Sequence, residues 1–311
     1  MQVYFLPGAL ICLAACMIFS ADAQSLNERL GYPPETKLLI IHSDDLAVAH
    51  SENQASFEAI ENGSVSSASV MVPCPWLLEV AEYAKAHPDH DFGLHLTLTS
   101  EWKHYKWGPV SSRSDVASLV NEHGHLYPDC SIMAAVATTE DVDRELRAQI
   151  EQAIAVGLDP THLDSHMGCL FFAKPGFFAS YMKLGREYRV PTMVSSDFLR
   201  LLPEDARKHI TTTDIVVDKI ITANPENFKA GFPTYYTELL NSLTSGVTVL
   251  LIHTAYDDHE MQGITIDHPD WGAAWRQQDF DFFTSDACKQ LLLKNEIRLI
   301  TWREIRDKLL R

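Results

Sequence analysis

Acidic and imidazole side chains stand at the ends of several strand-like segments of this chain. Asp44 and Asp45 follow one apolar run, His95 lies inside another, His253 ends a third, and residues 161–166 read Thr-His-Leu-Asp-Ser-His. Carboxylates and imidazoles bind divalent cations and transfer protons near neutral pH. Because these side chains come from separate segments, they predict one hydrolytic centre built from the ends of several strands.

Asp44 and Asp45 can divide the chemistry between them. Adjacent side chains on an extended backbone point to opposite faces, so the two carboxylates are not expected to share one role. One carboxylate can bind a cation, and its neighbour can take a proton from water. The alternative is that the pair caps the following helix, whose positive N-terminus favours carboxylates.

Imidazoles supply the other predicted ligands. A core histidine held by a backbone carbonyl is the alternative for His95. In an extended segment His162, Asp164 and His166 share one face, and Asp164 could fix a ring tautomer. A cation bound by Asp45, His95 and His166 would have three protein ligands and room for water, which is typical of a catalytic metal site.

His253 is the candidate general acid of this centre. It ends a continuous aliphatic and β-branched run, and a late strand of a barrel approaches the site from a different direction than the first strand. The alternative is a histidine that merely ends a strand.

Strand and helix patterns alternate along the chain and position these residues. The strand patterns cover residues 38–43, 68–72, 92–98, 162–167, 191–195, 215–221, 247–253 and 297–300. Thr139 to Val156 has a helix pattern with Thr139 as its expected cap. Apolar strands separated by helices indicate a parallel sheet buried on both faces. We therefore predict an α/β fold, a distorted (β/α) barrel of about seven parallel strands in a single domain over residues 24–311.

Composition excludes some partners. The chain has 311 residues, of which 25 are Lys or Arg and 42 are Asp or Glu, so its formal net charge is -17. A charge of this sign repels phosphate backbones and anionic lipid surfaces. We expect neither a nucleic acid nor a stable membrane partner.

The N-terminal residues have the pattern of a removed signal peptide. Residues 3–19 are apolar, and Ala21-Asp22-Ala23 gives the small-x-small pattern of a cleavage site. Cleavage after Ala23 would make the protein secreted or periplasmic. The alternative is a lipoprotein box at Leu13-Ala14-Ala15-Cys16, which would anchor the protein by a lipid on Cys16.

Four cysteines remain after such cleavage: Cys74, Cys130, Cys169 and Cys288. An oxidising compartment permits a disulfide. Their wide spacing does not predict a pairing, and we expect four small buried side chains.

The ordered motifs also carry a resemblance. The matching segments are Ser43-Asp44-Asp45-Leu46, residues 63–72, residues 93–99 and Thr161-His162-Leu163-Asp164-Ser165-His166. In this order they resemble the YdjC/ChbG family of carbohydrate deacetylases. The chain departs from many relatives after His166, where Met167-Gly168-Cys169 replaces further histidines.

The resemblance implies a distorted (β/α) barrel that removes N-acetyl groups from chitooligosaccharides and related sugars with a divalent cation. It implies Asp44 as catalytic base, a late histidine such as His253 as candidate acid, and Asp45, His95 and His166 as metal ligands. Two imidazoles and a carboxylate favour Zn²⁺, while Mg²⁺, Mn²⁺, Co²⁺ and Ni²⁺ stay open.

We therefore expect a metal-dependent hydrolase that acts on an amino-sugar oligosaccharide. The alternatives are a metal-independent glycoside hydrolase with paired carboxylates and a secreted carbohydrate-binding protein without turnover. Two long segments, residues 99–138 and 254–278, are expected to be functional loops. Their Trp107, Trp271 and Trp275 could stack on sugar faces or pack the loops themselves.

Overall fold

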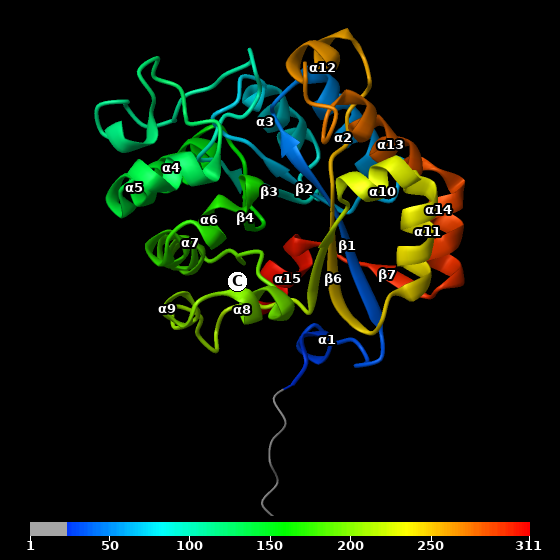
Figure 1. The fold of residues 1–311 in the computed structure, drawn as a ribbon. Coiled ribbons are helices and arrows are strands. Elements are labelled where there is room, and N and C mark those ends of the chain that lie inside the picture. The colour runs from blue at the N-terminus through cyan, green and yellow to red at the C-terminus, as the bar shows by residue number, and fades with distance from the viewer. Residues whose placement is uncertain (1–23) are drawn as a thin grey trace, which may run out of the picture.

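A curled parallel sheet forms the centre of the protein (Figure 1), seen in a computed structural model that describes residues 24–311. The predicted signal peptide, residues 1–23, lies outside the described residues. The strand order is β4-β3-β2-β1-β6-β5, and β7 also pairs with β1. The strands are β1 Lys37–Leu46, β2 Ser67–Val70, β3 Phe92–Leu96, β4 Leu163–Ser165, β5 Lys219–Thr222, β6 Gly246–Ile252 and β7 Ile297–Leu299.

Strand β1 organises the sheet because it pairs with three neighbours. Residues Lys37 to Ser43 pair with Gly246 to Ile252 of β6. β7 pairs with the first part of β1 and β2 with its second part, and every pairing is parallel. All strands therefore end at the same edge of the sheet, where Asp44 and Asp45 lie.

The sheet curls like part of a barrel, but among the described residues no regular strand joins β4 to β5 and closes it. Past β4, Thr192 forms one isolated bridge to Leu163, and Ser195 forms another to Val217, just before β5. The predicted α/β fold with a distorted barrel in a single domain is confirmed. The predicted strand at residues 191–195 is wrong, because this segment makes isolated bridges only.

Helices cover the outside of the curled sheet. In Figure 1, α5 and α7 lie on one side, and α11, α13 and α14 lie on the other. The helices are α1 Leu26–Arg29, α2 His50–Glu61, α3 Leu77–Ala86, α4 Cys130–Val136, α5 Thr139–Ala155, α6 Cys169–Phe172, α7 Pro175–Tyr188, α8 Ser196–Leu201, α9 Glu204–Arg207, α10 Pro225–Ala230, α11 Phe232–Ser242, α12 His259–Ile264, α13 Ala273–Thr284, α14 Asp286–Lys294 and α15 Trp302–Leu309, with 3-10 turns Ala117–Leu119 and His166–Gly168. The cap of α5 is Thr138, whose side chain accepts from Asp141 N, and not Thr139 as predicted.

The two faces of β1 pack against different cores. Leu39 and Ile41 pack with the cluster under α11, α13 and α14. Leu38 and Ile40 pack with Trp302 and other residues of a second cluster at α15. Because side chains alternate along a strand, His42 and Asp44 continue the face of Leu38 and Ile40.

Gly93 on β3 is required by a close approach between strands. A Cβ at this position would overlap the imidazole ring of His162, which is fully buried. We expect Gly93→Ala to lower the free energy of unfolding by about 1–3 kcal/mol, because the ring has no space to move into. Urea denaturation measures this, with Gly263→Ala as the control, since a Cβ there would meet nothing within 4 Å. Equal stability of the two variants would contradict the prediction.

Two of the four cysteines form a disulfide, so the expectation of four unpaired side chains is wrong for them. Cys130 is bonded to Cys169, and Cys74 and Cys288 are free and buried. Sequence spacing could not find this pair because the partners are 39 residues apart and meet only through the fold. Among residues 24–311, no helix combines the length and the apolar character that a membrane crossing requires.

Candidate metal centre

Three side chains from three segments converge at the carboxyl edge of the sheet. Asp45 Oδ1 lies 3.2 Å from His95 Nε2 and 3.2 Å from His166 Nδ1. All three residues are buried. These are the three ligands predicted from the sequence, and their facing atoms form a group that could hold a metal ion.

The outer partners of the two rings leave lone pairs facing Asp45. His95 Nδ1–H donates to Asp164 Oδ1 over 2.8 Å, and His166 Nε2–H donates to Glu101 Oε2 over 3.0 Å. In neutral rings the other nitrogens, His95 Nε2 and His166 Nδ1, are then acceptors. Carboxylates behind metal-binding imidazoles are the usual way to fix the tautomer and raise ligand basicity.

Asp45 completes a set of three acceptors. Its Oδ2 accepts from Arg276 Nη2 over 2.7 Å. Its Oδ1 is buried and has no hydrogen-bond partner within the described residues. Two imidazole lone pairs and one carboxylate oxygen that meet at a point need a cation between them, so this donor set fits a divalent metal.

Without a cation, protons hold this cluster together. Burial disfavours the charged form of His166, but Glu101 and Asp45 outweigh it and raise the pKa of His166 to about 9. Asp164 and Asp44 likewise outweigh burial and raise the pKa of His95. Arg276 and the two imidazoles overcome the effect of burial and lower the pKa of Asp45. A metal ion must therefore displace protons from the rings.

The backbone at the end of β1 brings both aspartates to one site. Asp45 has φ 72° and Ala47 has φ 79°, both in the left-handed region. This turn sends the Asp45 side chain toward His95 and His166 instead of to the opposite face. The alternative that the pair caps the next helix is wrong, because the N-cap of α2 is Ala49, with no side-chain hydrogen bond.

Asp44 lies beside the three ligands with its two oxygens in different surroundings. Its Oδ1 lies 3.0 Å from His42 Nε2 and accepts from Ser69 Oγ over 3.3 Å. Its Oδ2 lies 3.9 Å from His253 Nε2. The oxygen nearer to His253 is thus the one available for proton transfer.

His253 lies directly after β6 and reaches both carboxylates. Its Nε2 is 3.9 Å from Asp44 Oδ2 and from Asp45 Oδ2. Burial lowers the pKa of His253 to about 4, with Arg276 also lowering it and the two aspartates opposing. Asp279 Oδ2 accepts from the backbone N–H of His253 over 3.0 Å, which fixes the position of this residue. The ring is therefore neutral near pH 7 in the ion-free protein.

The structure places Asp164 and His166 differently than an extended segment would. β4 ends at Ser165, and His166 begins a 3-10 turn in which Met167 has φ 53°. Asp164 orients His95 on the neighbouring strand, while His162 Nε2 lies 4.0 Å from Asp164 Oδ2. The expected tautomer-fixing role of Asp164 therefore applies to His95.

Arg276 and Glu101 contribute to the site, and sequence reasoning missed both. Arg276 on α13 is fully buried and binds Asp45 and Glu52. Glu101 follows β3 and binds His166. Glu101 lies in the expected loop 99–138. The expected loop 254–278 contains α12 and the start of α13, so the expectation is wrong for these residues, and Arg276 is on the second of these helices.

A cavity of about 500 Å³ opens over these residues. Trp102, Met167 and Trp271 line it together with the aspartates and histidines. Trp271 is one of the predicted sugar-stacking candidates and is partly exposed. Trp107 and Trp275 are buried and pack the segments that carry them.

The disulfide ties the turn of His166 to the segment that carries Glu101. Cys169 follows the 3-10 turn, and Cys130 begins α4 in the segment 99–138. We expect replacement of both cysteines by serine to lower the free energy of unfolding by about 2–5 kcal/mol, since the open chain gains freedom when unfolded. Urea denaturation of the oxidised protein measures this. Dithiothreitol should destabilise the natural chain and leave the double variant unchanged; equal sensitivity of both would contradict the prediction.

Comparison with known proteins gives consistent matches. A family model described as YdjC-like protein matches residues 38–294. A carbohydrate deacetylase of Thermus thermophilus is 31% identical over 91% of this chain and 99% of its own length. A chitooligosaccharide deacetylase of Yersinia enterocolitica is 33% identical over 42% of this chain and 49% of its own length. A crystal structure from Enterococcus faecalis, of a proposed cellobiose-phosphate cleavage protein, has the same fold, with a TM-score of 0.73 and 24% identity over 87% of this chain and 99% of that chain.

Proposed function

We propose that this chain, which belongs to the YdjC family, is a metal-dependent carbohydrate deacetylase that removes N-acetyl groups from an amino-sugar oligosaccharide. The observation that carries the proposal is the convergence of three acceptors, Asp45 Oδ1, His95 Nε2 and His166 Nδ1, beside the carboxylate of Asp44. A cavity open to this point can admit a substrate.

A divalent cation bound by Asp45, His95 and His166 would supply Lewis-acid chemistry, polarising the acetyl carbonyl and making water more acidic. Asp44 takes a proton from the water molecule, and the water oxygen forms a bond to the acetyl carbon. The C–N bond then breaks, the nitrogen takes up a proton, and the products are a free amine and acetic acid, which releases its proton to solvent and becomes acetate. Two imidazoles and one carboxylate favour Zn²⁺ for this position.

His253 delivers the proton to the departing nitrogen. Because its ring is neutral near pH 7 in the ion-free protein, it must receive that proton during the reaction. Asp44 Oδ2 lies 3.9 Å from His253 Nε2, a gap that one bridging water spans, so it can pass on the proton that it took from the reacting water. One proton then travels from water to Asp44, to His253 and to the amine.

The cavity supports a sugar as substrate. Trp271 lines it and is partly exposed, and a large aromatic ring offers a flat apolar face to a carbohydrate. The Yersinia relative is a chitooligosaccharide deacetylase, which supports an N-acetylated amino sugar as the substrate. We place the enzyme outside the cytoplasm, since disulfides such as Cys130–Cys169 persist in oxidising compartments.

The test is acetate release from N-acetylated chitooligosaccharides. We expect no acetate from chelator-treated protein and renewed release when a single divalent metal is restored, with Zn²⁺ first among those tried. New reducing ends without acetate would indicate a glycoside hydrolase instead. Release that is unaffected by chelation would exclude the metal-dependent mechanism, and binding without any product would indicate a carbohydrate-binding protein.

A further inference from the structure

We infer that His42 is a positioning residue that holds the Asp44 carboxylate through Oδ1 and so presents its Oδ2 to the reacting water. The inference rests on the proposed function, in which Asp44 takes the proton. His42 lies on β1 two residues before Asp44, on the same face of the strand. It is completely buried, so it can affect the reaction only through the side chains that it contacts.

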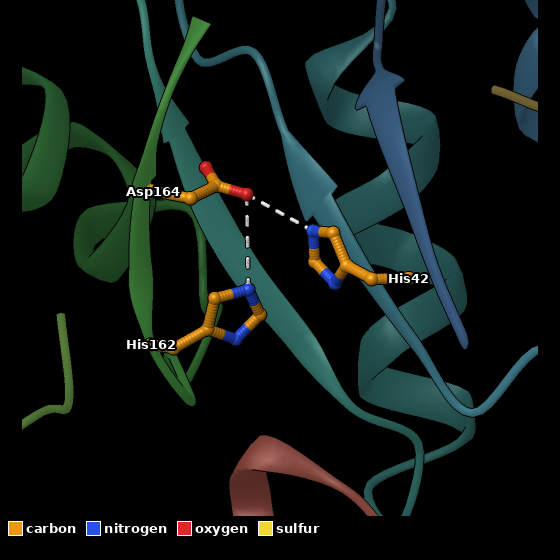
Figure 2. A group of neighbouring side chains, drawn as sticks. All are labelled: His42, His162 and Asp164. Atoms are coloured by element: carbon orange, nitrogen blue, oxygen red, sulfur yellow. Dashed lines mark hydrogen bonds and ion pairs between the residues drawn. The ribbon is translucent and has the colours of Figure 1, made fainter. Parts of the chain in front are cut away.

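A single ring nitrogen of His42 meets two carboxylates. Its Nε2 lies 2.9 Å from Asp164 Oδ2 and 3.0 Å from Asp44 Oδ1. Figure 2 shows the imidazole of His42 and the carboxylate of Asp164 approaching from facing strands. Carboxylate oxygens only accept hydrogen bonds, so Nε2 must carry a hydrogen.

The charge of the ring matches this position. Burial disfavours the charged form, but the hydrogen bonds to Asp164 and Asp44 outweigh it and raise the pKa of His42 to about 9. The other nitrogen, Nδ1, lies 2.9 Å from Ser67 Oγ, which can accept a hydrogen bond from it when the ring is charged. The imidazolium therefore separates two buried carboxylates that would repel each other without it.

The consequence for Asp44 is a fixed orientation. The contacts of Oδ1 with His42 and Ser69 orient the carboxylate so that Oδ2 faces His253. The same imidazolium binds Asp164, whose Oδ1 accepts from His95. One buried ring thus links the proposed base to the acid that orients a proposed ligand.

His162 is close but does not share this function. Burial and the charge of His42 hold the pKa of His162 well below its usual range, so its ring is neutral. Its Nε2 has no hydrogen-bond partner among the described residues and lies 4.0 Å from Asp164 Oδ2. A second cation among His42, His162 and Asp164 is the competing arrangement. The 2.9 Å contact of His42 with Asp164 has the length of a direct hydrogen bond and favours a proton there.

The experiment compares two substitutions at one position in metal-loaded protein. His42→Leu removes the donor, and we expect kcat to fall about 10²-fold because the base is misoriented, with KM and one bound ion per chain retained. His42→Gln keeps an N–H donor near the position of Nε2 and should recover most of the rate. His123→Gln, at an exposed histidine, is the matched control for the same chemical change. Adding His42→Leu to Asp44→Asn should cost little further rate, because His42 acts through Asp44.

A readout without turnover separates this inference from the proposed function. Nitrogen NMR of the ion-free protein, labelled in histidine, should detect both ring nitrogens of His42 protonated at pH 7. A ring without a hydrogen on Nε2, a second bound ion per chain, or a wild-type rate in His42→Leu would overturn the inference. If His42→Leu does not fold, the NMR spectrum and the rate of His42→Gln decide. Absence of deacetylation by the natural chain would contradict the proposed function. The protonation of His42 would then still be tested by the NMR measurement.

Discussion

Asp44→Asn is expected to lower kcat about 10²- to 10⁴-fold, the range associated with loss of a general base. The amide keeps the shape of the carboxylate and can still accept a hydrogen bond from His42 through its oxygen. It cannot take a proton from water, so only the chemical step is lost. Asp44 is not one of the three proposed ligands, Asp45, His95 and His166, so KM and metal affinity should change little.

Asp45→Asn is the matched comparison for this prediction. Asp45 Oδ1 faces both imidazoles, so its replacement should weaken metal binding, and excess metal should restore part of the rate. Steady-state rates and metal titrations of the two variants measure the difference. If Asp44→Asn also lost its metal, or kept the natural rate, the division of roles between the neighbouring aspartates would be wrong.

The proposed ligands could be predicted from the sequence because strand ends of a parallel sheet meet at one edge. Asp45 and His95 each sit in or just after an apolar run that forms a strand, and His166 directly follows β4. The strand pattern alone therefore predicts that these residues lie close together. The distorted barrel follows from the same pattern, since buried strands alternate with helices.

The residues that could not be predicted lie in segments without a recognised sequence pattern. Glu101 lies in the irregular segment that follows β3, and Arg276 lies on α13, a helix that begins inside the segment 254–278, which we expected to be a loop. The left-handed turn at Asp45 was also missed, because a residue with a Cβ seldom adopts positive φ. Strain of this kind is seen at functional sites, where surrounding contacts such as the bond from Arg276 hold it in place.

The outer shell of the site links metal binding to its protonation state. Asp164 and Glu101 orient the two rings for an ion and also stabilise the protonated rings when the ion is absent. The same carboxylates therefore favour both occupants of the centre. Whether protons or a metal ion occupy the centre depends on pH, because a ring nitrogen cannot bind a proton and a metal at once.

Metal affinity is accordingly expected to rise steeply with pH. The pKa of His166 is raised to about 9 and that of His95 is raised as well, so both rings are protonated at pH 7 without the ion. Raised pKa values mean that the competing protons are fully bound below that range and are lost as pH rises through it. If two protons leave on binding, affinity should increase about 100-fold per pH unit between pH 6.5 and 7.5, and the slope should fall once pH passes the pKa of about 9 of His166.

Isothermal titration in buffers of different ionisation enthalpy counts the released protons directly. Glu101→Gln provides the matched control, because loss of this carboxylate removes the main cause that raises the pKa of His166. Its pH dependence should fall toward one proton per ion, while a surface change such as Glu122→Gln should leave two. An affinity that stays constant from pH 6.5 to 7.5 would mean that His95 and His166 are already neutral, and that protons do not hold the ion-free centre together.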